Sequence, residues 1–338
     1  MRAESPFTDC TDLIGDRDRL LEHAHQNGYL FFSGLLPAEP VLALRQQVLR
    51  VAERHALLAP DTDPDAGIRR SGVFICEQDG SETFRNFYID VQKLRLFHAL
   101  PHHERILRVL EVLFGTSVFI HPRHICHIIF PGEHQYTTPP HQDFIPIQGT
   151  AETYTAWFPL HDLPPTMGGL EVAAGAHRGG VYNFQPALGA GGLAITDSFE
   201  WTGGPFAQGD VLFFHSMMPH RGVPNAGEQL RLSIDARYQR VADPIAPGSL
   251  LPHSQPNTWE AIYADWPDDR LQYYWRQYEL DVAEYDNSYH EERDRQALEL
   301  GEQGDPLAVS VLQRIIARDR DPDKRQRAAK LLTAIEEK

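Results

Sequence analysis

The sequence predicts a mainly β protein with flanking helices and a helical C-terminal extension. Between residues 117 and 239, short runs of β-branched and aromatic residues are separated by Gly and Pro, a pattern typical of strands. On both sides of this region, apolar residues recur at the three- and four-residue spacing of amphipathic helices. We therefore expect a core over residues 1–250 and an acidic, helical extension over residues 251–338, packed on the core or appended to it.

Ahead of the β region we expect one strand and three helices. Gly28 and Gly115 follow the first and third helical patterns, where a glycine commonly ends a helix, and Pro37 opens the second. The apolar run between the first two helices indicates a strand, and a Pro/Asp/Gly-rich stretch indicates a surface loop. The helices are 16–27, 37–57 and 102–114, the strand is 29–32 and the loop is 58–75.

The β region contains five expected strands: 117–130, 153–160, 169–174, 210–215 and 230–239. The last strand alternates strictly between apolar residues and the polar residues Arg231, Ser233, Asp235 and Arg237. Alternation of this kind gives a strand one apolar and one polar face. A polar face usually lies in solvent; the alternative is the mouth of a barrel that binds an anion.

Composition and charge narrow the class of protein. The chain carries 47 acidic and 31 basic residues, a net charge of −16, which disfavours binding to nucleic acid or to anionic membranes. No run of 18 apolar residues and no signal-like N-terminus is present, so we expect a cytoplasmic protein without a membrane span. The three cysteines are expected to be reduced. The oligomeric state stays open, and a small molecule is the expected partner.

Residues 251–300, the first part of the extension, account for half of the net charge. Residues 251–300 hold 12 acidic and 4 basic residues, a difference of −8. Two helical stretches follow, 306–318 and 322–338. They resemble one unit of a HEAT-type hairpin, although such repeats need several units to be stable. The alternative is a helical tail that packs on the core.

Two motifs look functional but lack the necessary context. Residues 189–194 match a loose dinucleotide-binding pattern without a preceding strand or a following helix. His121, His124 and His127 lie three residues apart in a segment expected to be extended, which places His121 and His127 on one face and His124 on the other. We interpret these three as core or surface histidines.

A third motif has the pattern of a metal site. His141 and Asp143 are two residues apart, so on a strand both side chains point the same way. His220 and Arg231 follow downstream, 11 residues apart. Two imidazoles and one carboxylate leave three positions free on a six-coordinate metal, as in non-haem Fe(II) oxygenases. A strand-borne Arg can bind a carboxylate through two hydrogen bonds.

The ordered set of motifs resembles the phytanoyl-CoA dioxygenase family of Fe(II)/2-oxoglutarate-dependent oxygenases. The resemblance covers roughly residues 15–245, and its members in chain order are residues 28–36 ahead of a helix, His141-Gln142-Asp143, Gly169-Leu170-Glu171-Val172, residues 174–177, Gly209-Asp210, His220 to Asn225, and Arg231. It implies a double-stranded β-helix, a jelly-roll or cupin-like fold. It also implies that His141, Asp143 and His220 bind Fe(II) and that Arg231 holds the distal carboxylate of 2-oxoglutarate, with O2 as the other co-substrate.

Several further residues follow from the resemblance. Thr155 and Trp157 would line the pocket, with Thr155 bonding the co-substrate, although Trp157 could equally be a core residue. Phe144 would form a wall beside the metal, and Arg123 could face an anionic substrate or lie in a surface ion pair. His215 is the alternative to His220 as third ligand.

One departure from the family pattern affects the co-substrate site. Relatives often carry Ser two residues after the distal His, where this chain has Gly222. The Ser hydroxyl contacts 2-oxoglutarate in those relatives. Ser233, two residues after Arg231 and on the same strand face, could supply this contact instead.

The implied activity is hydroxylation, or a related oxidation, of an unactivated C–H bond in a small molecule, with release of succinate and CO2. The carboxylate of Asp143 favours this over halogenation, since halogenating relatives replace it with a small residue. Two alternatives stay open: a metal-binding cupin-type isomerase or lyase that does not use 2-oxoglutarate, and a non-catalytic binding protein that acts through its helical tail.

Overall fold

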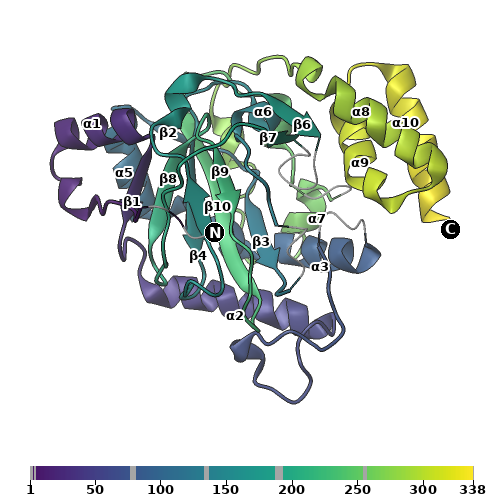
Figure 1. Ribbon diagram of the computed structural model, residues 1–338, viewed down its shortest axis with the longest axis horizontal. Coiled ribbons are helices and arrows are strands. Elements are labelled where there is room, and N and C mark those ends of the chain that lie inside the picture. Colours follow the sequence, from purple (N-terminus) through teal and green to yellow (C-terminus); the bar gives the residue numbers. More distant parts are fainter. Residues whose placement is uncertain are drawn as a thin grey trace.

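A six-stranded antiparallel sheet forms the centre of the computed structural model, which describes residues 3, 5–76, 81–132, 137–186, 193–253 and 257–337 (Figure 1). The strand order is β1-β8-β4-β10-β2, and β3 also pairs with β10. The strands are β1 (Tyr29–Phe32), β2 (Val118–Ile120), β3 (Ile125–Ile129), β4 (Tyr154–Pro159), β8 (Val211–His215) and β10 (Arg231–Arg240).

Strand β10 is the longest and lies inside the sheet. It pairs with β4 along one edge, and with β3 and then β2 along the other. Its apolar residues Leu232, Ile234, Ala236 and Tyr238 are fully buried in the large core cluster. Arg231, Ser233, Asp235 and Arg237 are also buried. The polar face is therefore buried, and the usual interpretation of a solvent-exposed face is wrong for this strand.

Helices cover the apolar face of the sheet. Side chains of β1, β4, β8 and β10 share one core cluster with the inward faces of α1, α2, α3 and α5. The expected helix signals act as predicted, since Asp16 caps α1 while Gly28 and Gly115 end α1 and α5 in left-handed conformations. The helices are α1 (Arg17–Asn27), α2 (Ala38–Arg54), α3 (Glu82–Gln92), α4 (Arg95–Ala99) and α5 (Glu104–Phe114).

A second layer of short strands faces the other side of the sheet. It contains β5 (Leu170–Val172) paired with β9 (His220–Gly222), and β6 (Phe184–Pro186) paired with β7 (Leu193–Ile195). Residues 140 and 141 join the two pairs, because His141 bridges to His220 and the Ile195 amide donates to the Pro140 carbonyl. Arg231 of β10 reaches across to this layer. The predicted site residues His141, His220 and Arg231 lie where the two layers face each other.

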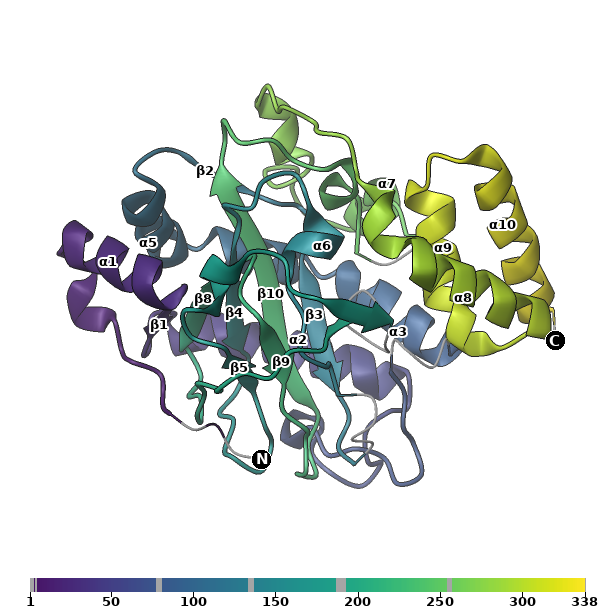
Figure 2. The same cartoon turned by 45° about the horizontal axis from the view of Figure 1, so that its top comes forward.

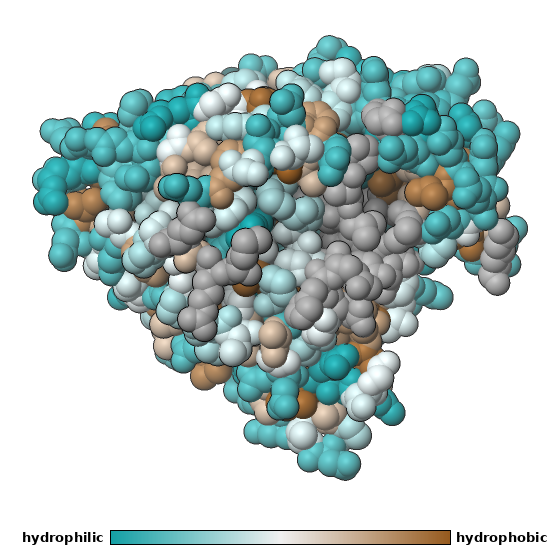
Figure 3. Space-filling model, viewed as in Figure 1, coloured by the Kyte–Doolittle hydropathy of each residue, from teal (hydrophilic) through white to brown (hydrophobic). Residues whose placement is uncertain are grey.

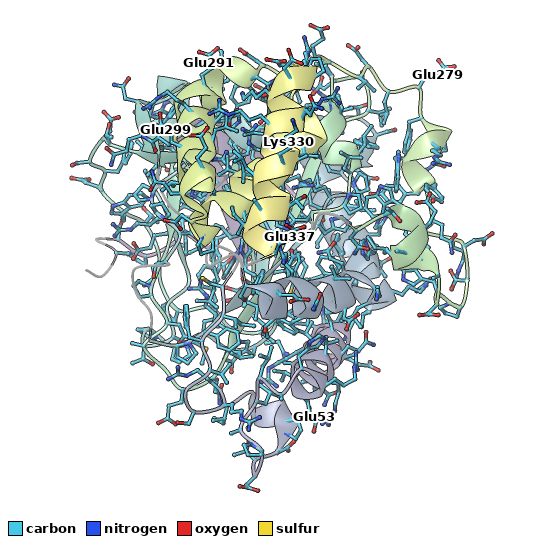
Figure 4. All side chains as sticks on the ribbon, turned by 90° about the vertical axis from the view of Figure 1, so that its right-hand side faces the viewer. Glu53, Glu279, Glu291, Glu299, Lys330 and Glu337 are labelled. Carbon is cyan, nitrogen blue, oxygen red and sulfur yellow. The ribbon has the colours of Figure 1, made fainter. Side chains whose placement is uncertain are left out.

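Among the described residues, the C-terminal extension contributes seven further helical segments, of which α8, α9 and α10 share a separate apolar cluster. They are α7 (Trp259–Tyr263), α8 (Glu291–Gln303), α9 (Val309–Arg318), α10 (Pro322–Glu336) and the 3₁₀ turns Tyr274–Gln277, Asn287–His290 and Pro306–Ala308. Figure 4 shows α8 and α10 side by side, with Glu299 on the first and Lys330 on the second. Their surface is largely hydrophilic in Figure 3. Within the described residues, no helix is both long and apolar enough to cross a membrane.

The structure departs from the sequence prediction in several elements. The predicted strand 117–130 is two strands, because residues 121–124 form an irregular turn. Helices α3 and α4 and strands β6, β7 and β9 were not predicted, since each is short or follows no clear periodicity. Residues 187–192, which include most of the dinucleotide-like motif, lie outside the described residues. The antiparallel sheet and the flanking helices are confirmed, and the three cysteines are buried.

Candidate metal centre

His141, Asp143 and His220 converge between the two layers. His141 and His220 exchange two backbone hydrogen bonds of 2.9 Å as an antiparallel bridge, which places their rings 4.0 Å apart. Asp143 is in helical conformation and precedes the one-turn helix α6 (Phe144–Ile147). The alternation of an extended strand, from which we predicted the His141–Asp143 pair, therefore does not hold through Asp143. The chain bends into α6 there, and this turn still directs the carboxylate toward the imidazoles.

The three side chains present their donor atoms to one point. The Nε2 atoms of His141 and His220 each lie 3.9 Å from Oδ1 of Asp143. Each Nδ1 atom donates a 3.0 Å hydrogen bond to a backbone carbonyl, of Pro139 and Met218 respectively. A proton fixed on Nδ1 leaves the Nε2 lone pair available, the usual arrangement of metal-binding histidines. Among the described residues this is the one His/Cys/Asp/Glu group with such geometry.

The second oxygen of Asp143 is held by the sheet. The Thr155 hydroxyl donates to Oδ2 at 2.7 Å, and Nη2 of Arg237 lies 3.3 Å from both carboxylate oxygens. Burial alone would raise the pKa of this carboxyl, but Arg237 and the two histidines hold it well below its usual range. The carboxylate is therefore ionised, and Oδ1 is the oxygen left to face the imidazoles.

The pKa of His141 is lowered to about 3, chiefly by burial and then by the neighbouring His220. The ring is thus neutral near pH 7, as metal binding requires.

Gln142, between the two predicted ligands, anchors the segment from the opposite side. Its amide nitrogen donates to the carbonyls of Gly180 and Met217 at 2.7 and 2.6 Å, and its oxygen accepts from the Tyr182 amide at 3.0 Å. All polar positions but one of this buried side chain are satisfied. Gln142 therefore fixes the backbone from which His141 and Asp143 project.

Arg231 is a buried guanidinium without an acidic partner among the described residues. Its Nη1 atom donates to the carbonyls of Val223 (2.6 Å) and Gly169 (3.2 Å), while Nε has no hydrogen-bond partner. Burial lowers its pKa to about 10, so it remains charged. The described residues offer no hydrogen-bond partner to the hydroxyl of Ser233, which lies on the same strand face. An uncompensated buried cation is costly, and binding of an anion at this point would relieve the cost.

The predicted pocket residues Thr155, Trp157 and Phe144 lie in three different environments. The Thr155 hydroxyl lies on Asp143, rather than pointing to open space where a co-substrate could bind. Trp157 packs between the layers against Phe206, at 4.7 Å between ring centroids, so its indole belongs to the core. Phe144 begins α6 and is partly exposed.

Arg123 and His215 lie away from the three converging side chains. The Arg123 guanidinium donates to backbone carbonyls of residues 251–253. His215, the alternative third ligand, packs against His177, with 5.4 Å between ring centroids, and its Nε2 lies 3.8 Å from Glu152. The geometry therefore favours His220 over His215.

Sequence reasoning did not identify the polar network behind Asp143, which consists of Arg237, Asp235 and His127. Arg237 also binds Asp235 at 2.9 Å, and Asp235 lies 3.5 Å from Nε2 of His127. The alternation of β10 had placed Asp235 and Arg237 on the face of Arg231, and this was the available signal. The expected alternation of His121, His124 and His127 fails because only His127 lies in a strand.

The donor set fits iron and 2-oxoglutarate. Two imidazoles and a carboxylate are the ligands of the facial triad, and the uncompensated Arg231 fits the distal carboxylate of the co-substrate. A Cβ at Gly222 would make only ordinary contacts of 3.5 Å with Thr137 and Thr138, so the missing Ser is not excluded by space. The assignment of individual ligands stays a prediction.

Comparison with known proteins gives one family. The model of the phytanoyl-CoA dioxygenase family matches residues 24–233. The 1-deoxypentalenic acid 11-beta-hydroxylases of Streptomyces arenae and Streptomyces exfoliatus are 28% and 26% identical, each over 73% of this chain and 90% of the relative.

Solved structures with partial similarity include two enzymes of nogalamycin biosynthesis. The non-heme alpha-ketoglutarate-dependent epimerase SnoN has 21% identity and a TM-score of 0.45, over 68% of this chain and 84% of its own. The carbocyclase SnoK has 17% identity and a TM-score of 0.48, over 71% and 88%. The family match covers more than half of the chain, which therefore belongs to the phytanoyl-CoA dioxygenase family, the non-haem iron oxygenases that use 2-oxoglutarate.

Proposed function

We propose that this protein hydroxylates an unactivated C–H bond of a small molecule in a reaction that requires Fe(II), 2-oxoglutarate and O2. The observation that carries the proposal is the combination of the His141, Asp143 and His220 donors with the uncompensated Arg231 guanidinium. Two curated relatives that align over 73% of the chain are named hydroxylases, which supports hydroxylation over other oxidations.

The core on which the site is built is proposed to be a double-stranded β-helix. The large sheet faces a layer of short strands, and Arg231 of β10 in the sheet reaches across to that layer, which supports this proposal. His220 lies in the layer of short strands and Arg231 in the large sheet, so a metal donor and the proposed co-substrate anchor come from facing layers.

Iron with bound 2-oxoglutarate supplies oxidative chemistry, in which O2 is consumed and succinate and CO2 are released. The chain's own residues prepare this chemistry. The Thr155 hydroxyl occupies Oδ2 of Asp143, which leaves Oδ1 to face the metal, while Nη2 of Arg237 lies equally close to both oxygens and keeps the carboxylate ionised. Arg231 and Ser233 orient the co-substrate by its distal carboxylate, and Phe144 borders the space beside the metal.

The two alternatives are less well supported. An isomerase or lyase without 2-oxoglutarate would have no use for a buried, uncompensated Arg231. A purely binding role for the helical tail would leave the converging metal donors without a function.

Release of succinate during turnover of a small-molecule panel tests the proposal. The wild-type enzyme should couple succinate release to a product 16 mass units heavier for its substrate. Arg231→Met should raise the KM for 2-oxoglutarate by at least about thirtyfold, because loss of a buried charge partner costs about 2 kcal/mol or more. Arg240→Met, on the same strand but paired at the surface with Asp243, is the matched control and should leave KM unchanged. Product formation that is unaffected by Arg231→Met would favour the 2-oxoglutarate-independent alternative.

A further inference from the structure

The C-terminal extension touches the chain directly after the metal-binding carboxylate. Helix α6 starts directly after Asp143 and ends at Ile147, and Gln148 is the residue that follows it. Figures 1 and 2 both show α6 on the side of the molecule that faces α8. The family model ends at residue 233, so the extension that makes this contact lies outside the matched region.

The contact is a pair of hydrogen bonds between the Gln148 side chain and the backbone of Asp286. The amide nitrogen of Gln148 donates to the Asp286 carbonyl at 2.7 Å, and the Asp286 amide donates to the Gln148 oxygen at 2.6 Å. Gln148 is 5% exposed, so water competes little for these bonds. The Tyr285 hydroxyl adds a longer, 3.5 Å contact to the Ile145 carbonyl inside α6. We call the Gln148–Asp286 pair the clasp.

The backbone at the clasp is strained. Gln148 has φ 53° and ψ −159°, a region that is essentially reserved for glycine. The next residue, Gly149, lies so close to the 244–246 backbone that a Cβ would meet the Pro244 carbonyl at 2.7 Å. Ile245 in turn pairs with the extension at Asp281 and Ala283. Two segments therefore hold the strained conformation of Gln148. One is the extension itself at Asp286, and the other is residues 244–246, which pair with the extension.

The extension also approaches the other end of the ligand segment. The Ile195 amide of β7 donates to the carbonyl of Pro140, the residue before His141. Phe184 of the paired strand β6 packs against Tyr289 of the extension, with 6.4 Å between ring centroids. Residues 140–148, which carry two of the three metal donors, are thus bracketed by contacts that lead to residues 285–290.

We propose that the C-terminal extension helps to position the metal-binding segment of the oxygenase site. Gln148 is the positioning residue, which couples residues 284–290 to Asp143 and Phe144. This inference rests on the proposed function, because it assumes that Asp143 binds iron. Coupling between two sites is reciprocal. Loading of the metal site must therefore stabilise residues 284–290, and release of the clasp must weaken iron binding.

Gln148→Gly tests the coupling in a chain that should still fold. Glycine relieves the strain at this position, which offsets the lost hydrogen bonds, while the clasp itself is removed. Gln148→Glu is the second variant, since it keeps the size and the acceptor but loses the donor to the Asp286 carbonyl. Arg327→Ala, which removes the exposed Arg327–Glu302 pair elsewhere in the extension, is the matched control.

Two measurements are made on the full-length variants under anaerobic conditions: Fe(II) affinity by titration, and hydrogen exchange with and without Fe(II) and 2-oxoglutarate. In the wild type, loading should slow exchange in both 143–149 and 284–290. Gln148→Gly and Gln148→Glu should weaken Fe(II) binding by about tenfold, a typical effect of residues that support a metal ligand, and should abolish the slowing in 284–290. Arg327→Ala should behave as the wild type.

The outcomes separate this inference from the proposed function. If the wild type binds Fe(II) and 2-oxoglutarate but exchange in 284–290 does not respond, the inference is wrong. Unchanged iron affinity in both Gln148 variants, or an unchanged response of 284–290, overturns it equally. If the wild type binds no Fe(II), the proposed function itself has failed.

Discussion

At the scale of single residues, the best-determined feature of the site is the environment of Asp143. One carboxylate oxygen faces the two imidazoles, and the other accepts from Thr155 and lies beside Arg237. Arg237 also pairs with a second carboxylate, that of Asp235, at 2.9 Å. The carboxylate is therefore oriented before any metal arrives, which reduces the entropy lost on binding.

Thr155→Val tests this orientation. Valine keeps the shape of the side chain but leaves Oδ2 without its hydroxyl donor in a buried site, so Fe(II) affinity should fall by about tenfold or more. Anaerobic titration with Fe(II) measures the effect, and Thr155→Ser, which retains a hydroxyl, should stay close to the wild type. Equal affinities of the Val variant and the wild type would show that Thr155 does not orient the ligand.

At the scale of elements, strand β10 joins the fold to the site. Its apolar face packs under the helices, and its polar face lies between the layers with Arg231, Ser233, Asp235 and Arg237. The loop opposite must approach closely to accept from Arg231. Gly168 makes this approach possible, since a Cβ there would meet the Val223 carbonyl, an Arg231 acceptor, at 2.4 Å.

The connection between β2 and β3 carries a different kind of histidine. His124 is 1% exposed, packs edge-on to Phe97 and lies near His98, and neither ring nitrogen has a hydrogen-bond partner among the described residues. Burial lowers the pKa of His98 to about 4 and of His121 to about 3, and that of His124 lies well below its usual range. These rings are neutral core residues.

The buried histidines predict how stability depends on pH. Each takes up a proton in the unfolded chain below about pH 6.5 but resists protonation in the folded protein, so the free energy of unfolding should decrease as pH falls from about 6.5 to 4. His124→Phe removes one such group and should flatten the dependence by up to about 1.4 kcal/mol per pH unit. Urea unfolding between pH 7 and 4.5 measures this, with the exposed His25→Phe as control. An unchanged slope in His124→Phe would mean that His124 is not a buried neutral ring.

At the scale of the whole molecule, the two faces of the large sheet each pack against an apolar cluster. The larger core lies between the sheet and the N-terminal helices, and the smaller one, with Trp157, lies between the two β layers. The α8–α10 helices have their own apolar cluster and meet the core near α6 and, through the Arg85–Glu336 pair, near α3. The division of the chain at about residue 250 stays a prediction, although these contacts make the extension a neighbour of the site.

Local patterns predicted the parts of the structure that local chemistry controls. Helix ends at Gly28 and Gly115 and the alternation of β10 were readable because capping and burial depend on nearby residues. The metal site requires that His141 and His220 lie side by side, although they are 79 positions apart in the sequence. Only the resemblance to a family linked these two residues. The alternation of β10 gave the face of Arg237 but not its contact with Asp143, and the contacts of Gln142 and the clasp could not be predicted either, because all of these partners lie far along the chain.

Anaerobic addition of Fe(II) and 2-oxoglutarate to the purified protein tests the central claim most directly. Chelation of iron by the co-substrate in a facial-triad site gives a weak charge-transfer band in the visible spectrum. We predict this band for the wild type, and its loss in Asp143→Ala. A wild-type protein that binds iron without the band, or a band that persists in Asp143→Ala, would contradict the assignment of His141, Asp143 and His220 as the metal ligands.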